Sequence, residues 1–300
     1  MSSADLYPLT LEPIVADQIW ARPGEEASPD ESLPPIFFGT LLMAGGGSRI
    51  VAGPQAGRSI SYLRQIWGPK LVGVESGGDY DGPLPVELKL KRTGDFALAV
   101  GLTEDSVWHF LSAGEDSSIN AGFNPGLKLN IAAKEAGRDA GRWSEFMPEY
   151  AVEPGQGILL PRHCPMLLGA GISVAQIGPP SKTIANWPLV GEGPEGLRQS
   201  VKSEPPVWLP EPMPGPGRTA LFRGSNLKIS LIAASHFSSV VNPDAATFLW
   251  PVFGRGRVRT RGPAPVTRLS PGKVVMLPAA LGRYAVESGG LVGYLLVEAF

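Results

Sequence analysis

A short sequence pattern occurs twice in this chain and limits the folds that it can adopt. Pro154-Gly155 precedes an apolar run at residues 158–160, and a proline ends that run. Pro271-Gly272 precedes the run at residues 274–277, and the internal spacing is the same. A Pro-Gly turn followed by an apolar run of this length predicts a β-strand. Because the second copy follows the first after 117 residues, the repeat suggests two similar β-domains.

The composition favours many short strands and excludes several classes of partner. The 300 residues include 38 glycines and 31 prolines, and only 18% are charged, which predicts an all-β protein with tight turns. A net charge of −2 gives no electrostatic basis for binding nucleic acid or a membrane surface. Cys164 is the single cysteine, and we find neither a leader pattern nor a long apolar span, so we expect a cytoplasmic protein.

Local patterns divide the chain into two strand-rich parts and a linker. Residues 59–67 have the apolar spacing of an amphipathic helix, and a second short helix is expected within 134–147. Proline and glycine dominate residues 192–218. We therefore predict an N-terminal domain at 1–190, a linker at 191–219 and a C-terminal domain at 220–300. Strands are expected at residues 37–43, 49–52, 83–91, 96–102, 107–111, 227–233, 247–253, 266–269, 274–277 and 291–297.

Several motifs, taken in order along the chain, resemble the short bacterial class I mannose-6-phosphate isomerases. The resemblance depends on their order and spacing and covers nearly the whole chain. It implies two cupin-like (jelly-roll) β-barrel domains with a few short helices. In active members of that family, a zinc ion assists proton transfer between C1 and C2 of mannose 6-phosphate and fructose 6-phosphate. The motifs are Tyr7-Pro8-Leu9, Gly53-Pro54 through Ser59, Leu84-Pro85-Val86, residues 107–111 with Ala121-Gly122-Phe123, the Pro154-Gly155 segment and residues 271–284.

The positions that correspond to the family's zinc ligands hold other residues in this chain. The resemblance aligns Val100 and Leu102 with a Gln-x-His pair, Ser106 with a glutamate and Met166 with a histidine. Valine and leucine have no atom that binds zinc. The resemblance therefore implies no bound metal and no catalytic residue here.

The remaining pocket positions keep polar or aromatic side chains. The resemblance places Lys89 and Trp108 at the pocket, and Thr183, beside Lys182, corresponds to an arginine of the family. We therefore expect a catalytically degenerate relative that retains a site for a sugar or sugar phosphate. The residues of this expected pocket are Lys89, Val100, Leu102, Ser106, Trp108, Met166, Lys182 and Thr183.

The three histidines are too few to rebuild the family's zinc site. His109 alternates with Trp108 and Phe110 along its strand, so it is expected to face away from the pocket. One alternative is an active isomerase with a rearranged site. That site would use His163, Cys164, Asp105 or Glu104.

Another alternative is a structural or interaction protein whose barrel is filled by its own apolar side chains. Four arginines recur at every second residue, which places them on one face of a strand. This face would be the contact surface of such a protein, although charges of this kind also occur on solvated strands. The four residues are Arg255, Arg257, Arg259 and Arg261.

Overall fold

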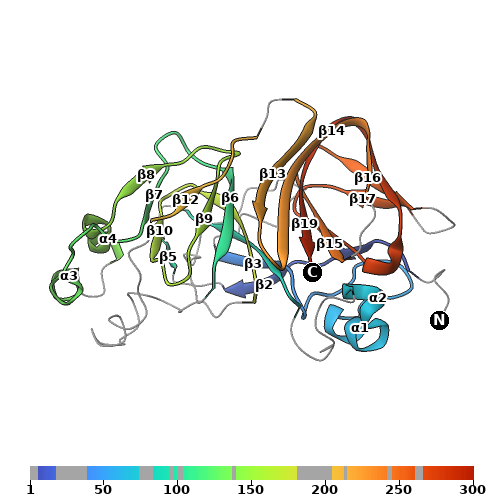
Figure 1. Ribbon diagram of the computed structural model, residues 1–300, viewed down its shortest axis with the longest axis horizontal. Coiled ribbons are helices and arrows are strands. Elements are labelled where there is room, and N and C mark those ends of the chain that lie inside the picture. The colour runs from blue at the N-terminus through green and yellow to red at the C-terminus, as the bar shows by residue number, and fades with distance from the viewer. Residues whose placement is uncertain are drawn as a thin grey trace.

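The computed structural model describes the chain as two β-units that lie side by side (Figure 1). All strand pairs are antiparallel and form three sheets, so the all-β prediction is confirmed, and the architecture is cupin-like. No helix among the described residues is long and apolar enough to cross a membrane. The described residues are 6–17, 39–73, 84–94, 98–100, 104–136, 140–180, 205–212, 215–241, 245–260 and 266–300.

The N-terminal unit contains a seven-stranded sheet and a four-stranded sheet. The seven-stranded sheet has, in spatial order, β12 (Val207–Trp208), β9 (Gly157–Leu160), β6 (Ser106–Ser112), β11 (Ser173–Gly178), β4 (Glu87–Arg92), β3 (Gly39–Ala44) and β2 (Ile14–Asp17). The smaller sheet has β5 (Leu98–Val100), β10 (Met166–Leu168), β7 (Ser118–Ala121) and β8 (Glu149–Ala151).

The C-terminal unit is one eight-stranded sheet that curls around its own core. Two long strands, of 15 and 16 residues, run through it. The main path is β1 (Leu9–Leu11), β18 (Val274–Leu277), β15 (Ala246–Phe253), β19 (Tyr284–Ala299), β14 (Leu227–Val241) and β13 (Gly217–Arg223). Beside it, β16 (Gly256–Thr260) pairs with β19, and β17 (Thr267–Leu269) pairs with β16.

The repeated Pro-Gly pattern forms the same local structure in both units, as predicted. Each pair makes a turn, and Gly155 and Gly272 have φ angles of 91° and 79°, which favour glycine. The strands that follow are β9 and β18. They occupy comparable places, since β9 lies between β6 and β12, and β18 lies between β15 and β1.

Two short strands complete these sheets from distant parts of the chain. β1 pairs with β18, where Leu9 lies opposite Met276, and both residues are fully buried. β12 comes from the predicted linker and pairs with β9, where Trp208 lies opposite Ile158. The sequence division at residues 190 and 220 places β1 in the N-terminal domain and β12 in the linker. In the structure, β1 belongs to the C-terminal sheet and β12 to the seven-stranded N-terminal sheet.

The helices confirm one prediction and shift the other. Ser59 caps α1 (Ile60–Trp67), where its hydroxyl accepts the Tyr62 backbone N–H at 3.2 Å. The second predicted helix begins earlier and has separate pieces. These are α3 (Leu129–Ala136), α4 (Ala140–Trp143) and the 3₁₀ turn η2 (Ser144–Phe146). Two further elements were not predicted, namely α2 (Pro69–Val72) and η3 (Ala279–Leu281). Residues 49–52 were predicted as a strand but form only isolated bridges.

One apolar core joins the two units, and each unit also has an interior core. The joint core contains Ile177 of β11, Trp250 of β15 and Leu63 of α1. A second core lies between the two N-terminal sheets, where Trp108 and Met166 belong to the same cluster. The third core fills the C-terminal barrel around Tyr294. Alternate residues of β6 and β15 therefore face different cores.

Candidate functional site

A row of side chains crosses the inner face of the seven-stranded sheet. Lys89 lies opposite Gln176, and Gln176 lies opposite Trp108 on its other side. Residues that are directly opposite in an antiparallel sheet point to the same face. Because Trp108 belongs to the core between the two N-terminal sheets, Lys89 and Gln176 also face the barrel interior. Polar groups thus enter an otherwise apolar barrel.

A second lysine lies beside this row. Lys91 is two residues after Lys89 on β4 and is 4% exposed. Its Nζ donates a hydrogen bond to Thr40 Oγ1 at 3.2 Å and lies 5.9 Å from the centroid of the Trp108 ring. Lys89 Nζ forms an ion pair with Glu87 Oε2 at 2.8 Å. Two ammonium groups and one described carboxylate therefore lie along β4.

The polar atoms of the row differ in how well they are satisfied. Trp108 Nε1 donates a hydrogen bond to Ser106 Oγ at 2.7 Å. Gln176 is 4% exposed, and its Oε1 is buried without a hydrogen-bond partner. A buried acceptor without a partner costs about 1–3 kcal/mol of stability. A bound hydroxyl group would remove that cost.

The structure describes three of the four positions that the resemblance aligns with zinc ligands. Met166 is fully buried in the barrel core and lies opposite Val100 in the pairing of β10 with β5. Ser106 lies on the neighbouring sheet, where its hydroxyl is bonded to Trp108. No three His, Cys, Asp or Glu side chains within the described ranges are grouped to hold a metal ion. Leu102, Lys182 and Thr183 lie outside the described residues.

The four residues of the rearranged-site alternative differ in burial, backbone conformation and contacts. Cys164 is fully buried in the barrel core, and His163 has a φ angle of 62°. Asp105 Oδ1 accepts the backbone N–H of Arg162 at 2.7 Å, which holds this loop in place. Glu104 is exposed. The described part of the chain thus gives no metal-binding group at these positions.

His109 faces away from the pocket, as predicted. It lies opposite Ala175, a residue of the core that joins the two units. It is 2% exposed, and its Nδ1 has no hydrogen-bond partner. Burial lowers the pKa of His109 to about 4, because the charged imidazolium is poorly solvated there.

The sequence prediction of this site missed three residues. Lys91 was detectable, because the alternation of lysine and leucine along β4 places it on the same face as Lys89. Gln176 and Thr40 had no such signal. Their positions depend on the pairing of β11 and β3 with β4.

Replacing Ser106 with alanine should destabilise the protein by about 1–3 kcal/mol, because the buried Trp108 N–H loses its acceptor. Urea unfolding would measure this change. The control is Ser112→Ala at the other, exposed end of β6, for which we expect less than about 0.5 kcal/mol. Equal midpoints for the two variants would contradict the prediction.

Comparison with known proteins supports the fold. No protein-family model matches the chain, and no curated protein matches it by sequence. Among solved structures, it is similar to a putative mannosephosphate isomerase from Archaeoglobus fulgidus, with 10% identity, a TM-score of 0.75 and 98% of each chain covered. It is also similar to the mannose 6-phosphate isomerase from Bacillus subtilis, with 14% identity, a TM-score of 0.73 and coverage of 97% of this chain and 99% of that one.

A third structure of this kind contains zinc. It is a zinc-bound mannose 6-phosphate isomerase with 11% identity, a TM-score of 0.70 and coverage of 97% of this chain and 99% of that one. At identities this low, the structural similarity shows a common fold and nothing more. The chain therefore has the fold of the mannose-6-phosphate isomerases along nearly its whole length.

Proposed function

We propose that this protein binds a sugar phosphate inside its N-terminal barrel without zinc and without isomerase activity. One observation carries the proposal. The inner row of Lys89, Gln176 and Trp108 is polar, whereas the aligned metal positions hold Val100, Ser106 and Met166. A cytoplasmic location is part of the proposal, supported by the single, buried cysteine.

The row matches the chemistry of a phosphorylated sugar. The ammonium group of Lys89 holds Glu87 Oε2 at 2.8 Å and would contact the phosphate through its other N–H groups. A sugar hydroxyl would donate to the unpaired Gln176 Oε1. The face of Trp108 offers an apolar surface for the sugar ring. The names of the similar structures point to the same class of ligand.

The same residues give no support for aldose–ketose isomerisation. Moving a proton between C1 and C2 needs a base at the carbon and a group that polarises the oxygens. The buried Met166 thioether and the valine opposite it supply neither. Ser106 is already the acceptor of the Trp108 hydrogen bond. We therefore expect binding without turnover.

Zinc content and turnover test the loss of catalysis. Protein purified without chelators should contain far less than one zinc per chain, and it should not convert mannose 6-phosphate to fructose 6-phosphate. About one tightly bound zinc per chain together with isomerase activity would overturn the proposal. Loss of that activity in a variant lacking both His163 and Cys164 would support the rearranged site instead.

The variant Lys89→Met should weaken mannose 6-phosphate binding by about tenfold or more, since a charge-assisted contact contributes roughly 1.5–3 kcal/mol. Isothermal titration calorimetry would measure the affinity. Lys128→Met is the control, because Lys128 is exposed and lies outside the barrel row. Equal affinities of the two variants would show that the phosphate does not use Lys89.

A second candidate is an interaction protein with a filled barrel. The observation in its favour is that Met166 is fully buried among Ile119, Ala121 and Leu168. Its side chain occupies space that a ligand would otherwise take. Absence of any sugar-phosphate binding by the unmodified protein would favour this candidate over the first.

A further inference from the structure

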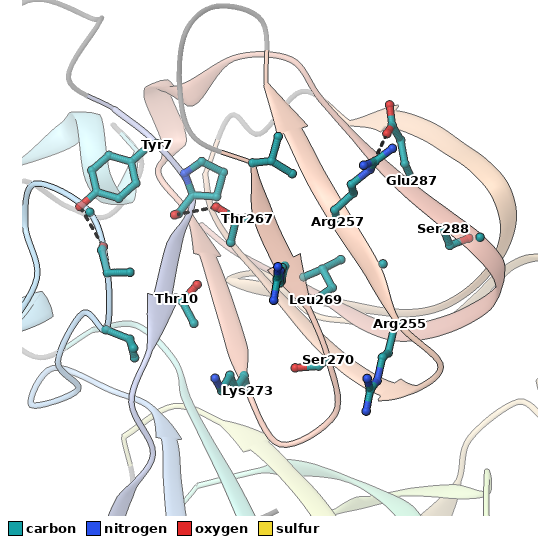
Figure 2. Close-up of a pocket in the computed structure, with 18 of the residues that line it drawn as sticks. Tyr7, Thr10, Arg255, Arg257, Thr267, Leu269, Ser270, Lys273, Glu287 and Ser288 are labelled. Carbon is teal, nitrogen blue, oxygen red and sulfur yellow. Dashed lines mark hydrogen bonds and ion pairs between the residues drawn. The ribbon is translucent and has the colours of Figure 1, made fainter. Parts of the chain in front are cut away.

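An open groove lies beside the C-terminal barrel and shares no residue with the inner row of the N-terminal barrel. Its volume is about 1230 Å³. One wall is the N-terminal segment with Tyr7 and Thr10, together with Val51 to Gly53. The other wall comes from β16, β17 and the turn before β18 (Figure 2). The size is sufficient for a small phosphorylated molecule.

Cationic side chains dominate the charge of this groove. Arg255, Arg257, Arg268 and Lys273 line it and are exposed, and the only described carboxylate in the lining is that of Glu287. Glu287 Oε2 accepts from Arg257 Nε at 2.9 Å and from Arg259 Nε at 3.0 Å. The single carboxylate is therefore shared by two guanidinium groups.

The other three cations form no ion pair with any described residue. Figure 2 shows Arg255, Ser270 and Lys273 near one end of the groove, whereas Arg257 extends toward Glu287 at the other end. Positive charge without a described counter-ion is thus gathered in a hollow of a protein whose net charge is −2. A concave surface with one sign of charge concentrates ions of the opposite sign.

The strand register places like charges side by side in this groove. Arg257 of β16 lies directly opposite Arg268 of β17, and Glu287 of β19 lies opposite Arg257 on the other side. Like charges that are directly opposite in a sheet destabilise it. A bound anion would convert this repulsion into two attractive contacts.

We propose that the groove is a second binding site, specific for a small molecule with two or more phosphate groups. Arginine suits this ligand, because its planar fork can make two hydrogen bonds to one phosphate. The hydroxyls of Thr10 and Ser270 add polar contacts at the same surface. Val51 and Val266, about half-exposed at the rim, would contact a less polar part of the ligand.

A solvated edge strand is the simplest competing explanation, and two features argue against it. Charges that protect an edge need only lie on the strand itself. Here Arg255 lies in the turn before β16, and Lys273 follows the turn after β17, yet both line the same hollow. The wall opposite them comes from the other end of the chain, through Thr10.

Titration calorimetry with tripolyphosphate tests this proposal on the full chain. We expect one ion to bind per chain, and the variant Arg255→Gln/Arg268→Gln should bind it at least about tenfold more weakly. Arg223→Gln is the matched control, because Arg223 is exposed on β13, at the opposite end of the main strand path from β1. Lys89→Met separates this site from the N-terminal row and should leave tripolyphosphate binding unchanged.

Thermal unfolding gives a second readout. Without ligand, Arg268→Gln should raise the melting temperature by about 1–3 °C, because the repulsion from Arg257 is removed. With tripolyphosphate, the unmodified protein should gain stability and this variant should gain much less. A nucleoside triphosphate that binds more tightly than tripolyphosphate would identify the valine rim as part of the site.

Two results would overturn the proposal. One is absence of tripolyphosphate binding by the unmodified protein at moderate ionic strength, where exposed charges are only partly screened. The other is equal weakening by Arg255→Gln/Arg268→Gln and by Arg223→Gln, which would show non-specific attraction to the surface. Because the test uses different residues from the N-terminal row, either site can fail while the other stands.

Discussion

Replacing Trp108 with alanine should lower the free energy of unfolding by about 3–5 kcal/mol, the range for removing a large aromatic side chain from a core. The side chain is fully buried among residues of both N-terminal sheets. Its loss also leaves Ser106 Oγ without the Trp108 donor. Packing between the two sheets should therefore suffer more from this change than from replacing Lys89 or Gln176.

Urea unfolding followed by circular dichroism would measure this loss. Trp108→Phe should cost less, because most of the ring volume stays and only the indole hydrogen bond is removed. Trp208→Ala is the control from the same sheet, since Trp208 is 41% exposed on the edge strand β12 and should cost about 1–2 kcal/mol. A loss at Trp108 no greater than that at Trp208 would contradict the assignment of Trp108 to the centre of the core.

The protein should lose stability between pH 6.5 and pH 4 because of His109. Its pKa is about 4 in the folded protein, below the ordinary value of 6.5 that it regains on unfolding. In this interval the unfolded chain binds a proton that the folded protein does not, so stability falls as the pH falls. The histidine contributes on the order of 3 kcal/mol across this window, all of which is available above pH 6.5.

His109→Leu should remove this part of the pH dependence, because leucine cannot be protonated. The measurement is the free energy of unfolding in urea at several pH values from 4 to 7. His236→Gln is the control, since His236 is exposed. An unchanged slope in His109→Leu would refute the assigned cause.

Local features of the fold were predictable because they depend on neighbouring residues. The Pro-Gly turns before β9 and β18 and the cap of α1 follow from a few adjacent side chains. The exchange of β1 and β12 was not predictable in this way. Leu9 and Met276 meet only in the folded sheet, and nothing in either segment specifies the partner.

The candidate site was predictable to the same extent. Lys89 and Trp108 were expected, and the structure places both on the inner face of one sheet. Gln176 joins them because its strand pairs with both β4 and β6, which is a property of the sheet as a whole. Of the four arginines expected on one strand face, Arg257 and Arg259 lie on β16, Arg255 lies in the turn before it, and Arg261 lies outside the described residues. The groove residues Arg268 and Lys273 were missed, because they come from the next strand and its turn.

The pairing of β1 with β18 sets an order of events during protein synthesis. Leu9 and Leu11 leave the ribosome long before Met276 is made, and at about 5–20 residues per second the interval is roughly 13–53 s. Throughout that time β1 is an apolar strand without its partner, a state that favours aggregation. β1 can therefore join its sheet only after the last strands of the chain are made.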